Sequence, residues 1–452
     1  MSYLSFKKDQ LINLEYSLAR EFLGTNRGGG YCSSTLVFCN TRKYHGLLVV
    51  PIEKFRGKNY VMLSSLDETI LQHGRDFNFG VHKYEGTYEP RGHKYIVDIS
   101  YEKAFTVTYQ VGGVVLKKEI LMMHNAPQVL IRYTLEDAHS ATLLRLNPLL
   151  AFRDIHSLSK QNPVANTQVE EVDGGVRAKL YPEFPYLYMQ LSKPANFGGA
   201  AYWNNNIYYT KEKERGYDFQ EDLLSVGAFE VSLKKGESIV FSASLEEAKS
   251  KNLAKDFTKY LKERADRNSF EECLQYTASQ FIIQKAGETR IKAGYHWYDS
   301  TTRDTFIALP GIALSGSTAK IFDEVLQSAL KYCYNGRFAR DISTHVINPV
   351  FDADTSLWFF WTLQQYEKET TKTKKQIWKE YGETLKTILN TFKSREHKTM
   401  RMDDNGLVWS DDLSHPLTWF NAENNYGPIV PRNGYVVEVN ALWYNAVCYA
   451  LE

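Results

Sequence analysis

The first half of the chain consists of short runs in which hydrophobic and polar residues alternate. In residues 105–109, FTVTY, every second residue is apolar, and the run resumes after the Gly-Gly pair at 112–113. This pattern predicts a β-hairpin. A similar pair of runs at residues 229–233 and 239–243 predicts a second hairpin. We therefore expect an antiparallel β-sandwich domain over residues 1–260.

The hydrophobic spacing changes to that of α-helices from about residue 250. One apolar stripe over residues 321–333 is followed by the Asn-Gly pair at 335–336, which predicts a helix that stops at this glycine. A second stripe covers residues 377–392. Asp354 precedes an apolar stretch that contains Trp358, and its carboxylate is placed to cap a third helix. These patterns predict a mainly helical domain over residues 261–452.

Composition narrows the classes of function. The 54 Lys and Arg residues balance 53 Asp and Glu residues, so the charge gives no reason to expect nucleic acid or anionic lipid as a partner. A membrane helix needs about 20 consecutive apolar residues, and no apolar run approaches that length. Residues 1–10 also lack the layout of a secretory signal, so we expect a cytoplasmic protein. The five cysteines form no pair or cluster with zinc spacing, and we expect no metal and no cofactor. Aromatic residues make up 14% of the chain, which fits both a packed core and the stacking of sugar rings.

Polar and aromatic residues gather in four segments of the helical half: residues 294–305, 348–358, 409–423 and 431–438. In the first segment, Arg303 and Asp304 could donate to and accept from neighbouring hydroxyls beside the ring of Trp297; the alternative is a structural ion pair at a helix start. Asp354 and Glu438 each precede a helix and could serve only its N-terminus. Carboxylates and tryptophans on loops that enter helices are what glycoside hydrolysis needs, because it uses an acid, a base and stacking rings.

Three segments of the first half resemble one known family. Residues 21–49 are similar to the opening of the bacterial and archaeal glycogen debranching enzymes of the amylo-α-1,6-glucosidase type, and NTRKYHG at residues 40–46 is the most specific part. LDET at residues 66–69 and FRDIH at residues 152–156 also resemble that family. The four segments of the helical half match its second domain in the same order, so the similarity spans the chain.

The resemblance implies a β-sandwich followed by a glucoamylase-like (α/α)6 barrel. The implied activity is release of the α-1,6-linked glucose at a branch point of an α-glucan, either glycogen or a limit dextrin, by an inverting mechanism with two carboxylates and no metal. The residues implied in substrate binding are Trp297, Arg303, Asp304, Asp354, Trp358, Trp419, Asn421 and Glu438, with Arg42 and His45 contributed by the sandwich.

The sequence departs from the family pattern in three ways. Residues 300–302, Ser-Thr-Thr, replace an Asp-Trp-Gly, which leaves the substrate detail open. Asn421 stands where the family has the acid, and an amide cannot replace a carboxylic acid, so Glu423 is the nearest candidate for the general acid ahead of Asp411 and Asp412. The sequence also predicts only about half of the twelve helices of an (α/α)6 barrel, so we expect the general base beyond residue 452.

These departures keep two other functions open. A non-catalytic α-glucan-binding or regulatory protein is favoured by Asn421 and by the short helical domain. An α-glucosidase of another linkage specificity is favoured by the altered residues 300–302.

Overall fold

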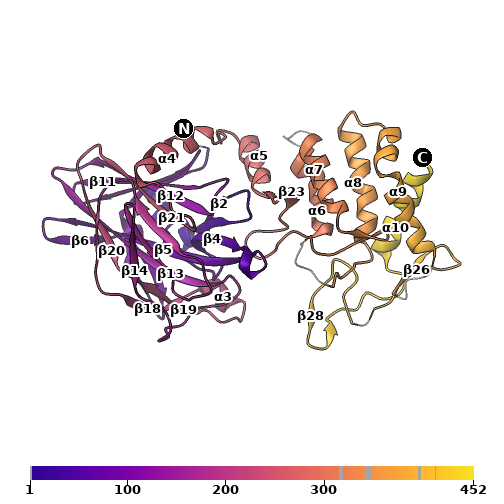
Figure 1. The fold of residues 1–452 in the computed structure, drawn as a ribbon, viewed down its shortest axis with the longest axis horizontal. Coiled ribbons are helices and arrows are strands. Elements are labelled where there is room, and N and C mark those ends of the chain that lie inside the picture. Colours follow the sequence, from indigo (N-terminus) through magenta and orange to yellow (C-terminus); the bar gives the residue numbers. More distant parts are fainter. Residues whose placement is uncertain (1–2, 315–318, 343–347, 395–398, 413) are drawn as a thin grey trace. The chain divides into compact units, whose positions relative to one another are not determined.

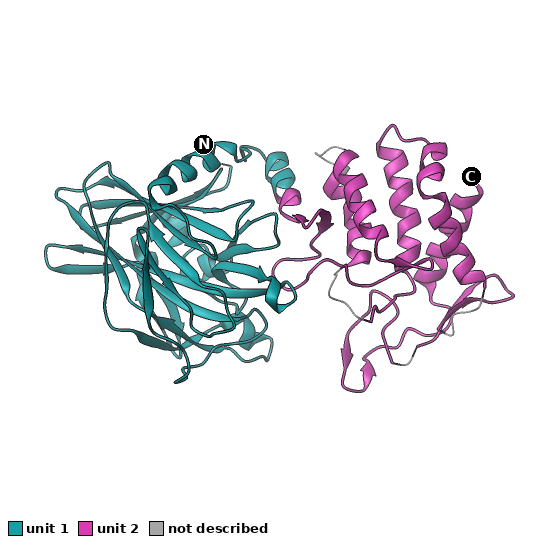
Figure 2. Ribbon diagram, viewed as in Figure 1, with its two compact units in different colours: residues 1–276 teal, residues 277–452 magenta. Residues whose placement is uncertain are grey.

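The computed structural model describes residues 3–314, 319–342, 348–394, 399–412 and 414–452. The chain forms two compact units, Met1–Tyr276 and Thr277–Glu452 (Figure 2). The division falls inside helix α5 (Phe270–Gln280), which is later than the change of hydrophobic period suggests, because α4 (Leu253–Glu263) belongs to the first unit. Apolar residues of α4 pack on the outer face of one sheet of that unit.

The first unit is built on two antiparallel sheets (Figure 1). One has nine strands in the order β1 (Ser5–Lys7), β9 (Ile96–Tyr101), β10 (Phe105–Val111), β11 (Val114–Met122), β12 (Gln128–Asp137), β21 (Ser238–Ser244), β16 (Leu187–Leu191), β15 (Gly175–Ala178) and β14 (Val169–Val172). The other has the order β17 (Asn196–Gly198), β20 (Ala228–Leu233), β13 (Thr142–Asp154), β5 (Lys58–Gln72), β4 (Gly46–Ile52), β3 (Tyr31–Thr35) and β2 (Glu21–Thr25), with β6 (Arg75–Asn78), β18 (Tyr202–Tyr208) and β19 (Gln220–Ser225) attached. A hairpin of β7 (Val81–Tyr84) and β8 (Thr87–Arg91) and the short helices α1 (Lys8–Leu11), α2 (Leu14–Leu18) and α3 (Thr210–Glu214) complete the unit.

Alternating side chains from the two sheets form one core, as expected of a sandwich. Phe22 of β2 stacks on Phe105 of β10 with 4.1 Å between ring centroids, which joins the sheets at one edge. The β10–β11 hairpin is confirmed, with Val111 opposite Val114. The second expected hairpin is wrong: β20 and β21 are both strands, but they lie in different sheets, because the chain crosses the sandwich between them.

The second unit is mainly helical. Its elements are β22 (Ile282–Lys285), β23 (Glu288–Ile291), α6 (Thr302–Leu309), the π-helical turn η4 (Pro310–Leu314), α7 (Ala319–Leu330), β24 (Cys333–Tyr334), β25 (Arg337–Phe338), α8 (Thr355–Glu369), α9 (Lys374–Lys393), β26 (Met400–Met402), β27 (Val408–Ser410), β28 (Glu423–Asn424), β29 (Gly427–Pro428) and α10 (Val437–Leu451). The expected order of an antiparallel β-sandwich followed by a helical domain is therefore confirmed.

Helix α8 is the centre of the second unit, because it packs against α6, α9 and α10. The predicted stripe of α9 is buried, but the stripe before it ends earlier than expected. Helix α7 stops at Leu330, and Asn335 and Gly336 form the two-residue turn between β24 and β25, where both have positive φ. An Asn-Gly pair suits such a turn as well as a helix end, and the sequence does not separate the two. Within the described part of the chain, none of the helices has the length and apolar character to span a bilayer.

The first unit contains a buried polar network beside the NTRKYHG segment. Glu221 of β19 is fully buried and accepts hydrogen bonds from Arg153 Nη2 at 2.9 Å, from the Ser159 backbone N–H at 2.9 Å and from the Tyr209 hydroxyl. Arg153 also donates to the carbonyl of Lys43 at 2.7 Å. The Arg153 guanidinium therefore joins the FRDIH segment to the NTRKYHG segment, and Glu221 holds this guanidinium in place.

A second buried pair joins β5 to the β7–β8 hairpin. His82 Nε2 lies 2.8 Å from Asp67 Oδ2, and both side chains are almost completely buried. Burial lowers the pKa of His82, but the charge of Asp67 and its hydrogen bond outweigh this and raise the pKa above the usual 6.5.

Glu221→Gln should lower the free energy of unfolding of the first unit by about 3 to 5 kcal/mol, because it leaves the Arg153 charge buried without its partner. The measurement is urea unfolding followed by tryptophan fluorescence. Glu136→Gln is the control, because Glu136 pairs with Lys117 at the surface and its loss should leave the midpoint nearly unchanged. Equal midpoints for the two variants would contradict the role of the network.

Protonated His82 should stabilise the fold below pH 6.5, and this contribution should disappear as the pH rises through its raised pKa. The difference in unfolding free energy between the wild type and His82→Gln should therefore be larger at pH 6 than at pH 9. Urea unfolding at the two pH values measures it, and a difference that grows with pH would show that the sign is wrong.

Candidate functional site

Arg303 and Asp304 lie in the first turn of α6 but face different surroundings. The Arg303 side chain is buried, whereas Asp304 is exposed. Thr301 precedes the helix and donates a hydrogen bond to Asp304 Oδ2 at 2.5 Å. Arg303 and Asp304 therefore do not form an ion pair with each other, and Asp304 is the one of the two that solvent or a ligand can reach.

Arg303 is held by two carboxylates from the segment before α8. Its Nε donates to both oxygens of Asp354 at 3.1 and 3.0 Å, and its Nη2 donates to Asp354 Oδ1 at 3.0 Å. The same Nη2 lies 2.7 Å from Asp352 Oδ2. Both carboxylates are buried, at 2% exposure for Asp352 and 1% for Asp354. Such bidentate geometry is the strong form of an arginine–carboxylate pair.

The sequence predicts that Asp354 caps α8, and this is wrong. Asp354 occupies the N-cap position, but its side chain makes no capping hydrogen bond, since its oxygens accept from Arg303. Burial raises the pKa of Asp354, with Asp352 acting in the same direction and Arg303 opposing both. Burial lowers the pKa of Arg303, but the two carboxylates outweigh this and raise it, so the guanidinium stays charged.

Arg340 completes the cluster, and the sequence analysis did not predict it as a site residue. Arg340 donates to Asp352 Oδ1 through Nε at 3.0 Å and through Nη2 at 2.7 Å. Asp341 follows it and lies opposite Thr301 in an isolated β-bridge. The available signal was the Arg-Asp pair at 340–341, which repeats the one at 303–304.

The loop that carries Trp419 is attached to the same cluster. The backbone N–H of Ala353 donates to the carbonyl of Leu417 at 2.7 Å, and Arg340 Nη2 donates to the carbonyl of Pro416 at 2.7 Å. Trp419 follows Leu417 by two residues and is 58% exposed. Its ring makes an edge contact with Phe420. An exposed indole is thereby tethered close to Asp354.

Trp358 lies one turn after Asp354 on α8, and its backbone N–H donates to the Asp354 carbonyl at 3.0 Å. Its half-buried ring makes an edge contact with Trp361. Trp297 is also half-buried and lies in the loop before α6, with its ring edge-on to His296.

Glu423 begins β28 in the small hairpin of β28 and β29, and Asn421 lies two residues before this strand. Both side chains are exposed. The hairpin closes through the backbone of Ile429, which donates to the carbonyl of Ala422 at 2.9 Å. Among the described residues, no hydrogen bond or ion pair joins the Glu423 carboxylate to the cluster of Arg303, Asp352 and Asp354. Glu423 is therefore exposed and is not linked to this cluster by any contact among the described residues.

Glu438 is the second residue of α10 and forms an ion pair with Arg432. The segment between them is fixed to β27 by two backbone hydrogen bonds between Ser410 and Gly434, at 3.0 and 2.7 Å. Glu438 therefore has both a charged partner and the favourable N-terminal position that the sequence suggests.

Arg42 and His45 belong to the first unit and converge on one carboxylate. Arg42 Nε lies 2.8 Å from Glu21 Oε1, and His45 Nε2 lies 3.5 Å from the same oxygen. The other ring nitrogen of His45 accepts from the Thr41 backbone N–H at 3.2 Å. Burial raises the pKa of Glu21, but hydrogen bonds and charge from His45 and Arg42 outweigh it and lower the pKa to about 2.

Solved structures show only weak likeness to the chain. A bacterial glucoamylase complexed with acarbose is 9% identical with a TM-score of 0.44, and the match covers 87% of this chain and 59% of the glucoamylase. The chain therefore spans less than two thirds of that protein. A putative aldose 1-epimerase from Escherichia coli K12 is 12% identical with a TM-score of 0.25, covering 50% of this chain and 98% of the epimerase. An alpha-mannosidase from Bacteroides thetaiotaomicron is 10% identical with a TM-score of 0.26, covering 93% of this chain and 68% of the mannosidase.

Two family models match successive parts of the chain. The family described as "Glycogen debranching enzyme N terminal" matches residues 20–240, and the family described as "Amylo-alpha-1,6-glucosidase" matches residues 276–452. No curated protein matches the chain. Because the two family matches follow each other along the chain and together take in most of both units, the chain belongs to the glycogen debranching enzymes.

Proposed function

We propose that this protein is a glycoside hydrolase that releases glucose from the α-1,6 branch points of a glycogen-type glucan. The observation that carries the proposal is the cluster of Arg303, Asp352 and Asp354 at the start of α8, next to Trp358 and the tethered Trp419. The match of residues 276–452 to the amylo-α-1,6-glucosidase family supports it. The (α/α)6 barrel and the inverting chemistry are part of the same proposal.

Each residue of the cluster has a separate task in this proposal. Arg303 is a positioning residue, because its ion pairs fix the direction of the Asp354 carboxylate. The exposed carboxylate of Asp304 accepts hydrogen bonds from sugar hydroxyls, and the rings of Trp358 and Trp419 stack on the apolar faces of glucose. Trp297, Asn421 and Glu438 line the remaining part of the substrate site in this proposal.

Glu423 is the proposed general acid. In an inverting glycosidase, one carboxylic acid protonates the leaving oxygen while a second carboxylate activates water on the opposite face of the sugar. Glu423 lies four residues after Trp419 on an exposed hairpin, so a bound glucan could reach it. Asn421, two residues before this strand, carries an amide, which is not an acid at neutral pH.

Asn421 also favours a second function, which is glucan binding without hydrolysis. Binding needs hydrogen-bond donors, acceptors and rings. An amide supplies both a donor and an acceptor, whereas an ionised carboxylate only accepts. Residues 300–302 are relevant to a third possible function, which is hydrolysis of another glycosidic linkage. Thr302 and Ser300 are buried there, and Thr302 donates to the Ala339 carbonyl at 2.6 Å. These small residues fix the loop and leave specificity to the exposed side chains beside them.

Glucose release from a glycogen limit dextrin tests the proposal. The wild type should release glucose from this branched substrate and not from a linear maltooligosaccharide. Glu423→Gln should lower the rate about 10²- to 10⁴-fold, because the amide cannot donate the proton. Its melting temperature should not change, since the side chain is exposed.

Glu383→Gln is the matched control, because Glu383 is an exposed glutamate on α9 far along the chain from these segments. Unchanged turnover by Glu423→Gln would remove Glu423 from the mechanism. A wild type that binds the dextrin without releasing glucose would favour the binding function.

Asp304→Asn should weaken glucose release about 10- to 100-fold, the loss expected for one charge-assisted hydrogen bond to the substrate. The fold should be intact, because Asn still accepts the hydrogen bond from Thr301. Steady-state kinetics beside a thermal melting curve measure both effects. A normal rate with a normal melting curve would show that Asp304 does not contact the substrate.

A further inference from the structure

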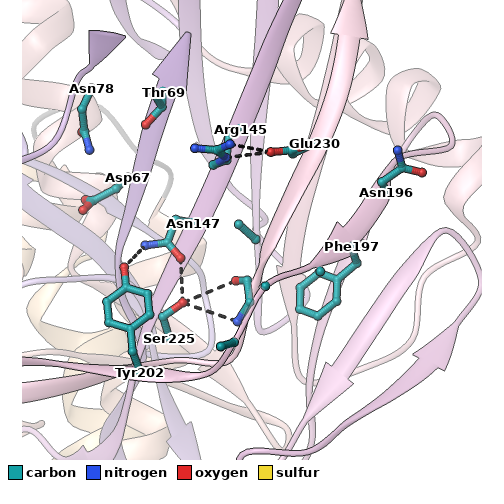
Figure 3. Close-up of a pocket in the computed structure, with 15 residues that line it drawn as sticks. Asp67, Thr69, Asn78, Arg145, Asn147, Asn196, Phe197, Tyr202, Ser225 and Glu230 are labelled. Carbon is teal, nitrogen blue, oxygen red and sulfur yellow. Dashed lines mark hydrogen bonds and ion pairs between the residues drawn. The ribbon is translucent and has the colours of Figure 1, made fainter. Parts of the chain in front are cut away.

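A row of polar side chains crosses five strands on the outer face of the ten-stranded sheet. Strand pairing places its members directly opposite one another in the order Asn78, Thr69, Arg145, Glu230 and Asn196. Directly opposed residues point to the same face of a sheet. Four strand spacings of about 4.8 Å give the row a length of about 19 Å. Figure 3 shows these side chains in the same order across the sheet.

A second, hydrogen-bonded row lies two residues along the strands. Asp67 of β5 is opposite Asn147 of β13. Asn147 donates to the Tyr202 hydroxyl at 2.8 Å and accepts from the Ser225 hydroxyl at 2.6 Å. Tyr202 and Ser225 are themselves opposite each other on β18 and β19. The amide of Asn147 is thus fixed in one orientation, with the half-exposed ring of Tyr202 (48%) beside it.

Small residues hollow the surface between and beside these rows. Residues 198–200 are Gly-Gly-Ala, and Gly227 and Ala228 face them across the β17–β20 pair. Gly227 has φ of +134°, and a Cβ atom there would lie 2.8 Å from the ring of Phe197. The result is a groove of about 590 Å³ with the rings of Tyr202 and Phe197 among its walls.

The chemistry of the groove suits a neutral, hydroxyl-rich ligand. Arg145 and Glu230 neutralise each other with 2.8 Å between Nη2 and Oε1, and Asp67 is paired with His82 beneath the surface. The lining therefore offers no excess positive charge for a phosphate. Its amides and hydroxyls donate and accept hydrogen bonds and its carboxylates accept them, which suits the hydroxyls of an oligosaccharide, since these both donate and accept.

We propose that this groove binds a linear segment of α-glucan, laid across the strands along the two polar rows. All of its residues belong to the first unit, and none is among the residues assigned above to hydrolysis. The identity of the sugar rests on the proposed function, whereas the existence of a carbohydrate groove rests on the rows themselves. The groove holds the polymer, and the helical unit performs the cleavage.

Hydrogen–deuterium exchange of the full chain with maltoheptaose tests this inference. Maltoheptaose should slow exchange in peptides that cover residues 196–208 and 225–233. Tyr202→Ala and Asn196→Ala should each remove that protection and weaken retention in a glycogen-containing native gel about tenfold, which corresponds to about 1.4 kcal/mol. Tyr202→Phe keeps the ring and should retain most of the binding.

Tyr3→Ala is the matched control, because Tyr3 is equally exposed in the same unit but lies outside the groove. Protection confined to peptides of residues 277–452, or protection that survives Tyr202→Ala, would overturn the inference. Glucose release from a glycogen limit dextrin, measured with the same protein preparations, separates the two proposals. A chain that protects the groove but releases no glucose supports the groove and refutes hydrolysis, whereas unprotected groove peptides with normal release do the reverse.

Discussion

The second unit depends on the rule that a buried charge must have a partner. Arg303 enters the interior from α6, Asp354 and Asp352 approach it from the start of α8, and Arg340 balances the second carboxylate. The backbone bond from Ala353 to Leu417 adds the loop with Trp419 to this assembly. Removal of any one charge would leave another uncompensated in a medium of low dielectric constant, so four separate segments keep their mutual positions or lose them together.

The sequence predicts elements well where the pattern is local. Alternating residues identify β10, β11, β20 and β21 as strands, and apolar stripes at helical spacing identify α7 and α9. Which strands pair and which helices pack together depends on contacts between residues far apart in the chain, and local hydrophobic spacing does not predict these contacts. Asp354 has the position of a capping residue, but its carboxylate is used by an arginine 51 residues earlier. The choice between these two partners is made by packing, not by local preference.

The motifs that make the first unit recognisable are largely structural. In the NTRKYHG segment, Tyr44 contacts the ring of His156 and Lys43 is held by Arg153, both from the FRDIH segment. In LDET, Glu68 lies between the sheets and pairs with the fully buried Lys118. Buried polar networks tolerate few substitutions because every donor and acceptor needs its partner. A distinctive sequence therefore identifies the family without identifying the residues that do chemistry.

The register of the ten-stranded sheet has a consequence for the behaviour of the protein in the cell. The polar row draws on residues from Thr69 to Glu230, and the strands that carry them are brought together only by the complete sheet. A polymer that contacts all five strands binds the native state and not the unfolded chain, so by mass action it raises the free energy of unfolding. If the groove holds an α-glucan as proposed, that polymer would protect the sandwich from heat and proteolysis while it is abundant, and the protection would fade as the polymer is consumed.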